Sequence, residues 1–182
     1  MELVELIRDK EKIEQVKRIF KESGTRDFLL FFMGINVGLR ISDFLKLKIS
    51  DVKSKDYIEI KEQKTGKHKR FPIADSFKSV LEEYTRDKNN DEWLFSSQRG
   101  DNNPITRIQA YRIINNACAK AGIKGKVGTH TLRKTFGYHF YQEKKDVALL
   151  QCLFNHSAPS ITLRYIGINQ DIIDSSLRSF AL

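Results

Sequence analysis

The chain has 182 residues and is 40% hydrophobic, which suits one globular domain with a buried core and excludes a wholly disordered protein. Its 32 lysines and arginines outnumber its 23 aspartates and glutamates, so the formal net charge is +9 and nucleic acid is the first candidate partner. A solvated basic surface without a partner is the alternative, and charge alone does not choose between them. No apolar run approaches the roughly 20 residues of a membrane span, and the acidic N-terminal segment lacks the pattern of a signal peptide. The sequence therefore predicts a cytoplasmic protein with no membrane partner.

Helical periodicity dominates the first part of the chain. Apolar residues recur at intervals of three and four from about Asp9 to Glu22, which predicts an amphipathic helix. Thr25 can cap a second helix, which is apolar on nearly every side as far as Ile35 and is therefore predicted to be buried. Gly38 ends this helix and another short helix should follow, so Arg40 is expected at a rigid junction between two packed elements.

A β-hairpin is predicted next. Apolar and polar residues alternate from Tyr57 to Ile60, which is typical of a strand, and Thr65 and Gly66 suit a turn. The segment from His68 to Ile73 would form the second strand, which leaves Lys64 at the hairpin tip. The elements expected after it are a helix over Ser76–Thr85, a short strand over Trp93–Phe95, a surface loop over Gln98–Asn103 and a helix over about Thr106–Ala121. The last helix should gather on one side the residues Ile108, Tyr111, Ile114, Ala117 and Cys118.

Three more helices are predicted in the C-terminal third, after a glycine-containing linker. They cover His130–Gln142, Asp146–Phe154 and Ser160 to about Gly167. An amphipathic end segment follows, with the apolar residues Ile172, Ile173, Leu177, Phe180 and Leu182. Cys118 and Cys152 lack the spacing of a zinc site or a redox pair, so both are expected to be reduced core residues.

Six polar residues without a shared periodicity carry the candidate chemistry: Arg40, Lys64, His130, Arg133, His156 and Tyr165. His130 and Arg133 are three residues apart, so they share a helix face and could grip one phosphate, although such a pair is usually an ordinary surface feature. Arg40 could simply be a cation at a helix end, but an arginine at a buried junction needs an anion.

A tyrosine nucleophile connects these six residues. A phenol with a pKa of about 10 must lose its proton to attack, so it needs nearby cations and a proton acceptor, which the arginines and histidines supply. Taken singly, Tyr165 could be a packed tyrosine and His156 a histidine at a helix end. Lys64 could be an ordinary lysine of a basic turn, or it could protonate a departing 5′ oxygen. Together the six residues have what a metal-free attack on a DNA phosphodiester requires.

Five stretches resemble the catalytic domain of the tyrosine recombinases, the phage integrase family. They are Gly-Leu-Arg-Ile-Ser-Asp (38–43), Lys-Thr-Gly-Lys-His-Lys-Arg-Phe-Pro-Ile (64–73), His-Thr-Leu-Arg-Lys-Thr-Phe (130–136), Phe-Asn-His-Ser (154–157) and Thr-Leu-Arg-Tyr-Ile-Gly (162–167). Their order and spacing are like those of the family. Asn155 stands where a glycine is usual and Phe154 where a leucine is common; asparagine tolerates a left-handed backbone, so the local geometry should survive. The resemblance implies an α+β fold, mainly helical, with a small antiparallel sheet.

The resemblance also implies a role for each residue of the site. Tyr165 would attack the scissile phosphate and form a 3′-phosphotyrosyl bond, while Arg40 and Arg133 clamp the non-bridging oxygens. His130 would act as base or donor beside the nucleophile, and His156 would donate a hydrogen bond to a phosphate oxygen.

Other residues would support this chemistry. Lys64 would be the general acid for the leaving 5′ oxygen, and Asp43 would orient Arg40 or His130 from behind. DNA contacts are expected from Lys67, Lys69, Arg70, Lys134 and Arg164.

The partner that the resemblance implies is double-stranded DNA, bound by four protomers that are monomers in isolation, in the cytoplasm of a bacterium or on the nucleoid. The C-terminal segment would dock onto a neighbour or fold back onto its own core. Neither a metal nor another cofactor is expected, because the phosphotyrosyl bond stores the energy for rejoining. Arg40 lies so early that residues 1–182 are expected to form a single catalytic domain without an N-terminal core-binding domain, as a fragment or as a compact recombinase.

Two other functions remain open at this stage. A type IB topoisomerase shares the chemistry and relaxes supercoils as a monomer, and a catalytically silent DNA-binding regulator could keep the fold for its basic surface. The sequence does not distinguish integration from excision, inversion or resolution, because base recognition depends on side-chain reach and DNA deformation.

Overall fold

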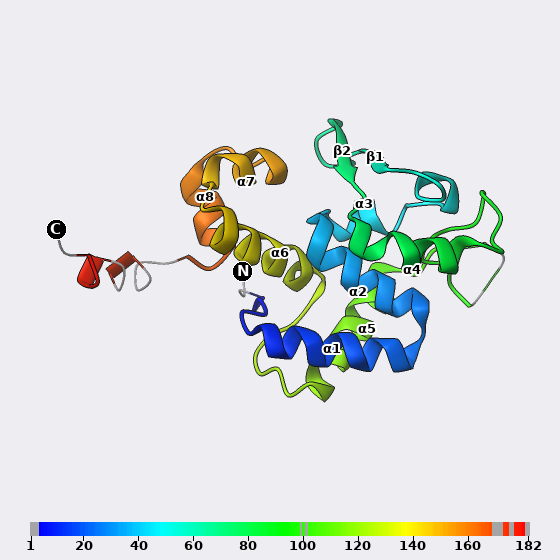
Figure 1. Ribbon diagram of the computed structural model, residues 1–182, viewed down its shortest axis with the longest axis horizontal. Helices are drawn as coiled ribbons and strands as arrows, with labels where there is room; N and C mark the ends of the chain where they lie inside the picture. Colours follow the sequence, from blue (N-terminus) through cyan, green and yellow to red (C-terminus); the bar gives the residue numbers. More distant parts are fainter. Residues whose placement is uncertain (1–3, 99, 101, 169–172, 175–176, 181–182) are drawn as a thin grey trace.

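The computed structural model describes residues 4–98, 100, 102–168, 173–174 and 177–180. These residues form a mainly helical fold with a two-stranded antiparallel sheet, as the sequence predicts (Figure 1). The helices are α1 Lys10–Ser23, α2 Thr25–Val37, α3 Ile41–Phe44, α4 Asp75–Thr85, α5 Arg107–Lys120, α6 Thr129–Lys144, α7 Val147–Phe154 and α8 Pro159–Tyr165. A 3-10 helix covers Ile49–Asp51, and the strands are β1 Tyr57–Lys61 and β2 His68–Pro72. No helix within the described ranges is long and apolar enough to cross a membrane.

The first two helices follow from their caps and apolar faces. Asp9 caps α1, accepting from the backbone N–H of Glu11 at 2.7 Å. The helix α2 is buried, as predicted, and Phe31 at its centre is fully enclosed. The predicted cap is wrong by one position: Gly24 precedes the helix, and Thr25 is its first residue.

The junction after α2 and the hairpin have the predicted geometry. Gly38 has a left-handed backbone with φ 69°, which ends α2, and Arg40 lies in an extended conformation before α3. In the hairpin, Ile58 pairs with Phe71, and both side chains are buried, whereas the alternate positions are mostly exposed. Gly66 supplies the positive φ of the turn.

Three sequence-based expectations are wrong in the middle of the chain. The strand expected over Trp93–Phe95 is reduced to one isolated bridge between Trp93 and Lys48. In α5, Ile108 is 63% exposed and Tyr111 is 45% exposed. The buried side of this helix consists instead of Ala110, Ile114, Ala117 and Cys118. Both cysteines are free, but Cys152 is exposed on α7, so only Cys118 is a core residue as expected.

A small apolar cluster attaches α7 and α8 to α6. Its fully buried members are Leu150, Phe154 and Ile166, and aromatic residues of α6 pack around them. Figure 1 shows α7 and α8 together on one side of α6. Of the predicted apolar end segment, Ile172 and Leu182 lie outside the described residues, and the exposed residues are Ile173, Leu177 and Phe180.

Candidate active site

Two arginines converge on the C-terminal end of α7. Arg40 donates from Nη2 to the backbone oxygen of Phe154 at 3.3 Å, and Arg133 of α6 donates to the same oxygen at 3.0 Å. Arg133 also donates to the backbone oxygen of Gly38, and its guanidinium lies 4.3 Å from the centroid of the Phe154 ring. Burial lowers the pKa of Arg133 to about 10, so it remains a cation at neutral pH. A guanidinium has five N–H donors, so both arginines keep donors for a phosphate.

The carbonyl groups at the end of α7 face further cations. Asn155 ends the helix with φ 54° and ψ 47°, which confirms the expectation of a left-handed backbone at this position. Lys69 of β2 donates to the backbone oxygens of Leu153 and Cys152, and Lys67 donates to Oδ1 of Asn155 at 2.9 Å. The negative end of the helix dipole therefore stabilises cations from the hairpin as well as from α6.

Tyr165 of α8 faces His130 of α6. The phenol oxygen lies 3.4 Å from Nδ1 of His130. Burial raises the pKa of Tyr165, and the charges of Arg133 and Arg40 offset this only in part. Desolvation lowers the pKa of His130, followed in importance by the charge of Arg107. A neutral imidazole beside a protonated phenol can accept the proton that a tyrosine nucleophile must lose.

His156 lies edge-on to Tyr165, with the two ring centroids 5.3 Å apart. Its Nδ1 is 3.0 Å from the hydroxyl oxygen of the buried Thr162. Burial lowers the pKa of His156 to about 4, and the charges of Arg133 and Arg40 act in the same direction. The ring is therefore neutral near pH 7. In the tautomer that carries its proton on Nε2, Nδ1 accepts from the Thr162 hydroxyl and the N–H of Nε2 can donate to a phosphate oxygen.

Lys64 lies in the exposed turn between β1 and β2. Its charge contributes to the lowered pKa of His156, which places the ammonium within electrostatic range of the other site residues. The structure thus gathers five of the predicted catalytic residues around the end of α7 and places Lys64 at the edge of the same site.

Asp43 is buried in α3, behind the hairpin tip. Its Oδ1 accepts from the backbone N–H of Gln63 at 3.0 Å, so it holds the hairpin tip against α3. Within the part of the chain that the structure describes, no hydrogen bond joins Asp43 to Arg40 or His130. Orientation of Arg40 or His130 by Asp43 from behind, through the hairpin tip that it holds, therefore stays a prediction.

Sequence analysis missed two residues of the site. Glu62 is 1% exposed and forms an ion pair with Arg40 at 2.7 Å. The one signal for Glu62 was an acidic residue beside a strongly basic turn, which is usually a solvated feature. Arg107, at the start of α5, was also missed; its charge acts on His130 although 23 residues separate them in the sequence.

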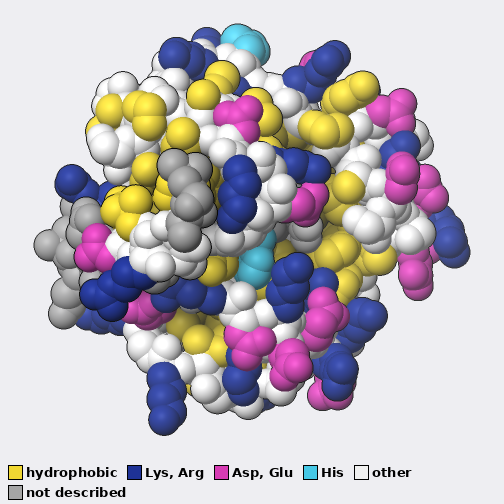
Figure 2. All heavy atoms as spheres, turned by 60° about the vertical axis from the view of Figure 1, so that its left-hand side comes forward, with side chains coloured by type: hydrophobic (Ala, Val, Ile, Leu, Met, Phe, Trp, Pro, Cys, Tyr) yellow, Lys and Arg dark blue, Asp and Glu magenta, His cyan; other side chains and the backbone are white. Residues whose placement is uncertain are grey.

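The five predicted DNA-contacting residues fall into two groups. Arg70 and Arg164 are exposed, as is Lys67. Lys69 and Lys134 are largely enclosed, because Lys69 binds carbonyls of α7 and Lys134, 7% exposed, donates to the backbone oxygen of Val4 at 2.8 Å. The burial of Lys134 therefore argues against its predicted contact with DNA. Figure 2 shows one face of the molecule, where basic side chains lie on both sides of a central histidine.

Within the described ranges, the structure has no group of three or more His, Cys, Asp or Glu side chains that could hold a metal ion.

The Phage integrase family model matches residues 9–171. The chain belongs to this family. It is 49% identical over 180 residues to a protein named probable integrase/recombinase YoeC from Bacillus subtilis (strain 168), a match that covers 99% of this chain and 98% of that protein. It is also 30% identical over 154 residues to type 1 fimbriae regulatory protein FimE from Escherichia coli (strain K12), covering 81% of this chain and 77% of FimE. The chain is accordingly an enzyme of the integrase/recombinase class.

Solved structures show the same fold at lower identity. A crystal structure of XerA recombinase has a TM-score of 0.79 at 23% identity, with the match covering 100% of this chain and 66% of that one. The XerH site-specific recombinase bound to its difH substrate in a post-cleavage complex has a TM-score of 0.75, covering 98% of this chain and 54% of XerH. The chain thus spans between half and two thirds of these two recombinases.

Proposed function

We propose that this chain is a site-specific recombinase that cleaves and rejoins double-stranded DNA through a 3′-phosphotyrosyl intermediate. The observation that carries the proposal is the position of the Tyr165 hydroxyl. It lies 3.4 Å from Nδ1 of a neutral His130, and its pKa is influenced by the charges of Arg133 and Arg40, the two guanidinium groups that share the Phe154 carbonyl. A phosphate on the free donors of Arg40 and Arg133 would lie within reach of that hydroxyl.

The proposed reaction conserves charge and atoms. The Tyr165 oxygen attacks phosphorus, its proton passes to His130, and the bond from phosphorus to the 5′ oxygen breaks. Lys64 supplies the proton that the leaving oxygen takes up, and Arg40 and Arg133 stabilise the charge of the pentacoordinate state. Rejoining is the reverse, with a 5′ hydroxyl attacking the phosphotyrosyl bond. No nucleotide is consumed, because that bond keeps the energy of the cleaved phosphodiester.

Double-stranded DNA is the proposed partner. The net charge of +9 and the exposed cations on the hairpin and α8 support binding to phosphates. Among the structural neighbours, XerH is bound to its difH substrate and lambda integrase is a dimer bound to a core site. Assembly of four protomers on DNA is proposed for this chain, with the exposed apolar residues Ile173, Leu177 and Phe180 as a contact between neighbours.

Covalent trapping on nicked duplexes tests the proposal. The duplexes are drawn from the DNA that flanks the gene, and the wild type is compared with Tyr165→Phe, a change that removes only the nucleophilic oxygen. A band shift measures binding by both proteins. The expected result is an adduct with the wild type alone and equal binding by both.

Each other outcome contradicts a separate part of the proposal. Binding without an adduct from either protein would favour a silent DNA-binding module. An adduct that persists in Tyr165→Phe would show that another residue is the nucleophile. Relaxation of supercoiled plasmid by a monomer, without strand exchange, would favour the topoisomerase.

A further inference from the structure

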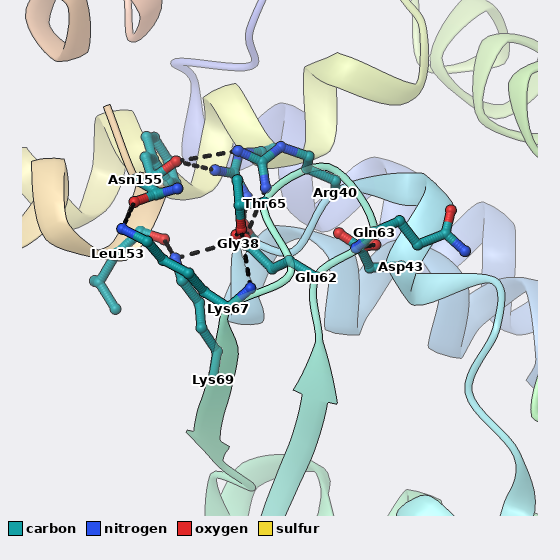
Figure 3. A network of polar contacts seen from close by, with 12 residues as sticks. Gly38, Arg40, Asp43, Glu62, Gln63, Thr65, Lys67, Lys69, Leu153 and Asn155 are labelled. Atoms are coloured by element: carbon teal, nitrogen blue, oxygen red, sulfur yellow. Dashed lines mark hydrogen bonds and ion pairs between the residues drawn. The ribbon is translucent and has the colours of Figure 1, made fainter. Parts of the chain in front are cut away.

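We propose that Glu62 is a positioning residue of this recombination site: its carboxylate fixes the Arg40 guanidinium and the turn that carries Lys64 relative to each other. The proposal rests on the proposed function. Glu62 is the last residue before that turn, and it is enclosed where β1 approaches the α2–α3 junction (Figure 3).

The two oxygens of the Glu62 carboxylate are divided between the two parts of the site. Oε1 accepts from Nη1 of Arg40 at 2.7 Å and lies 3.5 Å from the ammonium of Lys69. Oε2 accepts from the hydroxyl of Thr65 at 2.7 Å, inside the turn that contains Lys64. One planar group therefore joins a cation that binds the phosphate to the turn that would protonate the leaving oxygen.

The backbone of Glu62 closes the same turn. Its N–H donates to the backbone oxygen of Lys67 at 2.9 Å, and its carbonyl accepts from the N–H of Gly66 at 2.8 Å. The carboxylate is consequently attached to a rigid base, and movement of the turn would move the oxygen that holds Arg40. Figure 3 shows Glu62 among Arg40, Thr65 and Lys69, with Asp43 and Gln63 beside them.

The charge of Glu62 matters as much as its shape. Burial alone would raise the pKa of this carboxyl, but the Thr65 hydroxyl and the cations Lys69, Arg40 and Arg133 outweigh burial and lower it. Glu62 is therefore an anion at neutral pH. Because Nη1 of Arg40 is directed to this anion, the guanidinium is held at a fixed angle while other N–H groups remain for the phosphate.

Single-turnover cleavage of a nicked duplex at saturating protein separates positioning from binding. Glu62→Gln keeps the size of the side chain and removes its charge. Glu59→Gln is the matched control, because Glu59 is exposed on β1, three residues before Glu62, and loss of its charge changes the net charge equally. Thr65→Val removes the hydroxyl contact and leaves both cation contacts of Glu62 in place. Thermal unfolding checks that each variant is folded.

We expect Glu62→Gln to cleave about 10- to 100-fold more slowly than the wild type, the range for a hydrogen bond to a charged group. Its affinity for the duplex should stay within about threefold of that of Glu59→Gln, because the two proteins carry the same net charge. Thr65→Val should slow cleavage by roughly 2- to 10-fold, the range for an ordinary hydrogen bond, with unchanged affinity.

Four results would overturn the proposal. Cleavage by Glu62→Gln at the rate of Glu59→Gln would remove any positioning role, and faster cleavage would show that the carboxylate competes with the phosphate. If Glu62→Gln does not fold, the decision passes to Thr65→Val, whose wild-type rate would reject the link to the turn. Absence of an adduct with the wild type on every duplex would instead refute the proposed function, and the role of Glu62 with it.

Discussion

Gly137 permits the close approach of α6 to the pair α7–α8. A Cβ atom at this position would lie 2.7 Å from Cγ2 of Ile166 and 2.7 Å from two ring atoms of Phe154. Carbon atoms prefer separations of about 3.5–4.0 Å, so in Gly137→Ala something must move by about 1 Å. Both neighbours are fully buried and cannot swing into solvent. Ile166 directly follows Tyr165, the proposed nucleophile, so we expect the displacement to reach the phenol oxygen.

The stability and activity of Gly137→Ala should therefore differ in size. Overpacking costs about 1–3 kcal/mol, and the better helix propensity of alanine returns about 1 kcal/mol, so the net loss of unfolding free energy is about 0–2 kcal/mol. A misplacement of about 1 Å costs about 100-fold in rate. Urea unfolding measures the loss of stability, and single-turnover cleavage of a nicked duplex measures the loss of rate. Cleavage by Gly137→Ala within about threefold of the wild type would refute the reasoning, because the nucleophile would then tolerate the shift.

Three further predictions concern the end of α7. Because burial lowers the pKa of His156 from 6.5 to about 4, the unfolded state alone binds a proton between these values, so stability falls as the pH falls through that window. The loss of unfolding free energy should be at most about 3 kcal/mol, because solvent screens this partly exposed ring. Urea unfolding at several pH values measures it, and His156→Gln should lose less stability over the same pH range. Arg133→Lys should lose about 1–3 kcal/mol of stability and most cleavage, since one ammonium cannot replace the fork on the Gly38 and Phe154 carbonyls; unchanged urea unfolding would contradict this. Asn155→Ala should lower the melting temperature more than Asn155→Gly, by about 1 kcal/mol in equivalent free energy, and equal melting would argue against the left-handed backbone.

The parts of the site that sequence analysis predicted are those that local patterns encode. The spacing of His130 and Arg133 fixed their common face, and Gly38 fixed the junction before Arg40, because both depend on a single turn of backbone. The left-handed conformation of Asn155 was predictable for the same reason. The helical face of α5 was not, since Ile108 and Tyr111 fit an apolar period that the tertiary fold does not use.

The parts that it missed depend on distant backbone. The Phe154 carbonyl accepts from residues 114 and 21 positions away, and an acceptor that every residue possesses leaves no signal in a sequence. Glu62 looked like an ordinary acid in a basic hairpin, and only its burial against Arg40 shows its role. Lys134 looked like a surface lysine, but a backbone carbonyl 130 positions away binds it.

The shared carbonyl of Phe154 also bears on the order in which the site forms. Arg40 and Arg133 meet only where α7 ends, and Tyr165 follows that point in the chain by 11 residues. Arg40 and Phe154 lie 114 positions apart, and contacts of such long separation form slowly relative to local helices, so the N-terminal helices and the hairpin can fold before the site exists. During synthesis, a nascent chain that stops short of α7 has the cations of the hairpin and α6 but lacks Tyr165, the proposed nucleophile. Under the proposed function, strand cleavage therefore requires a chain that is complete at least through Tyr165.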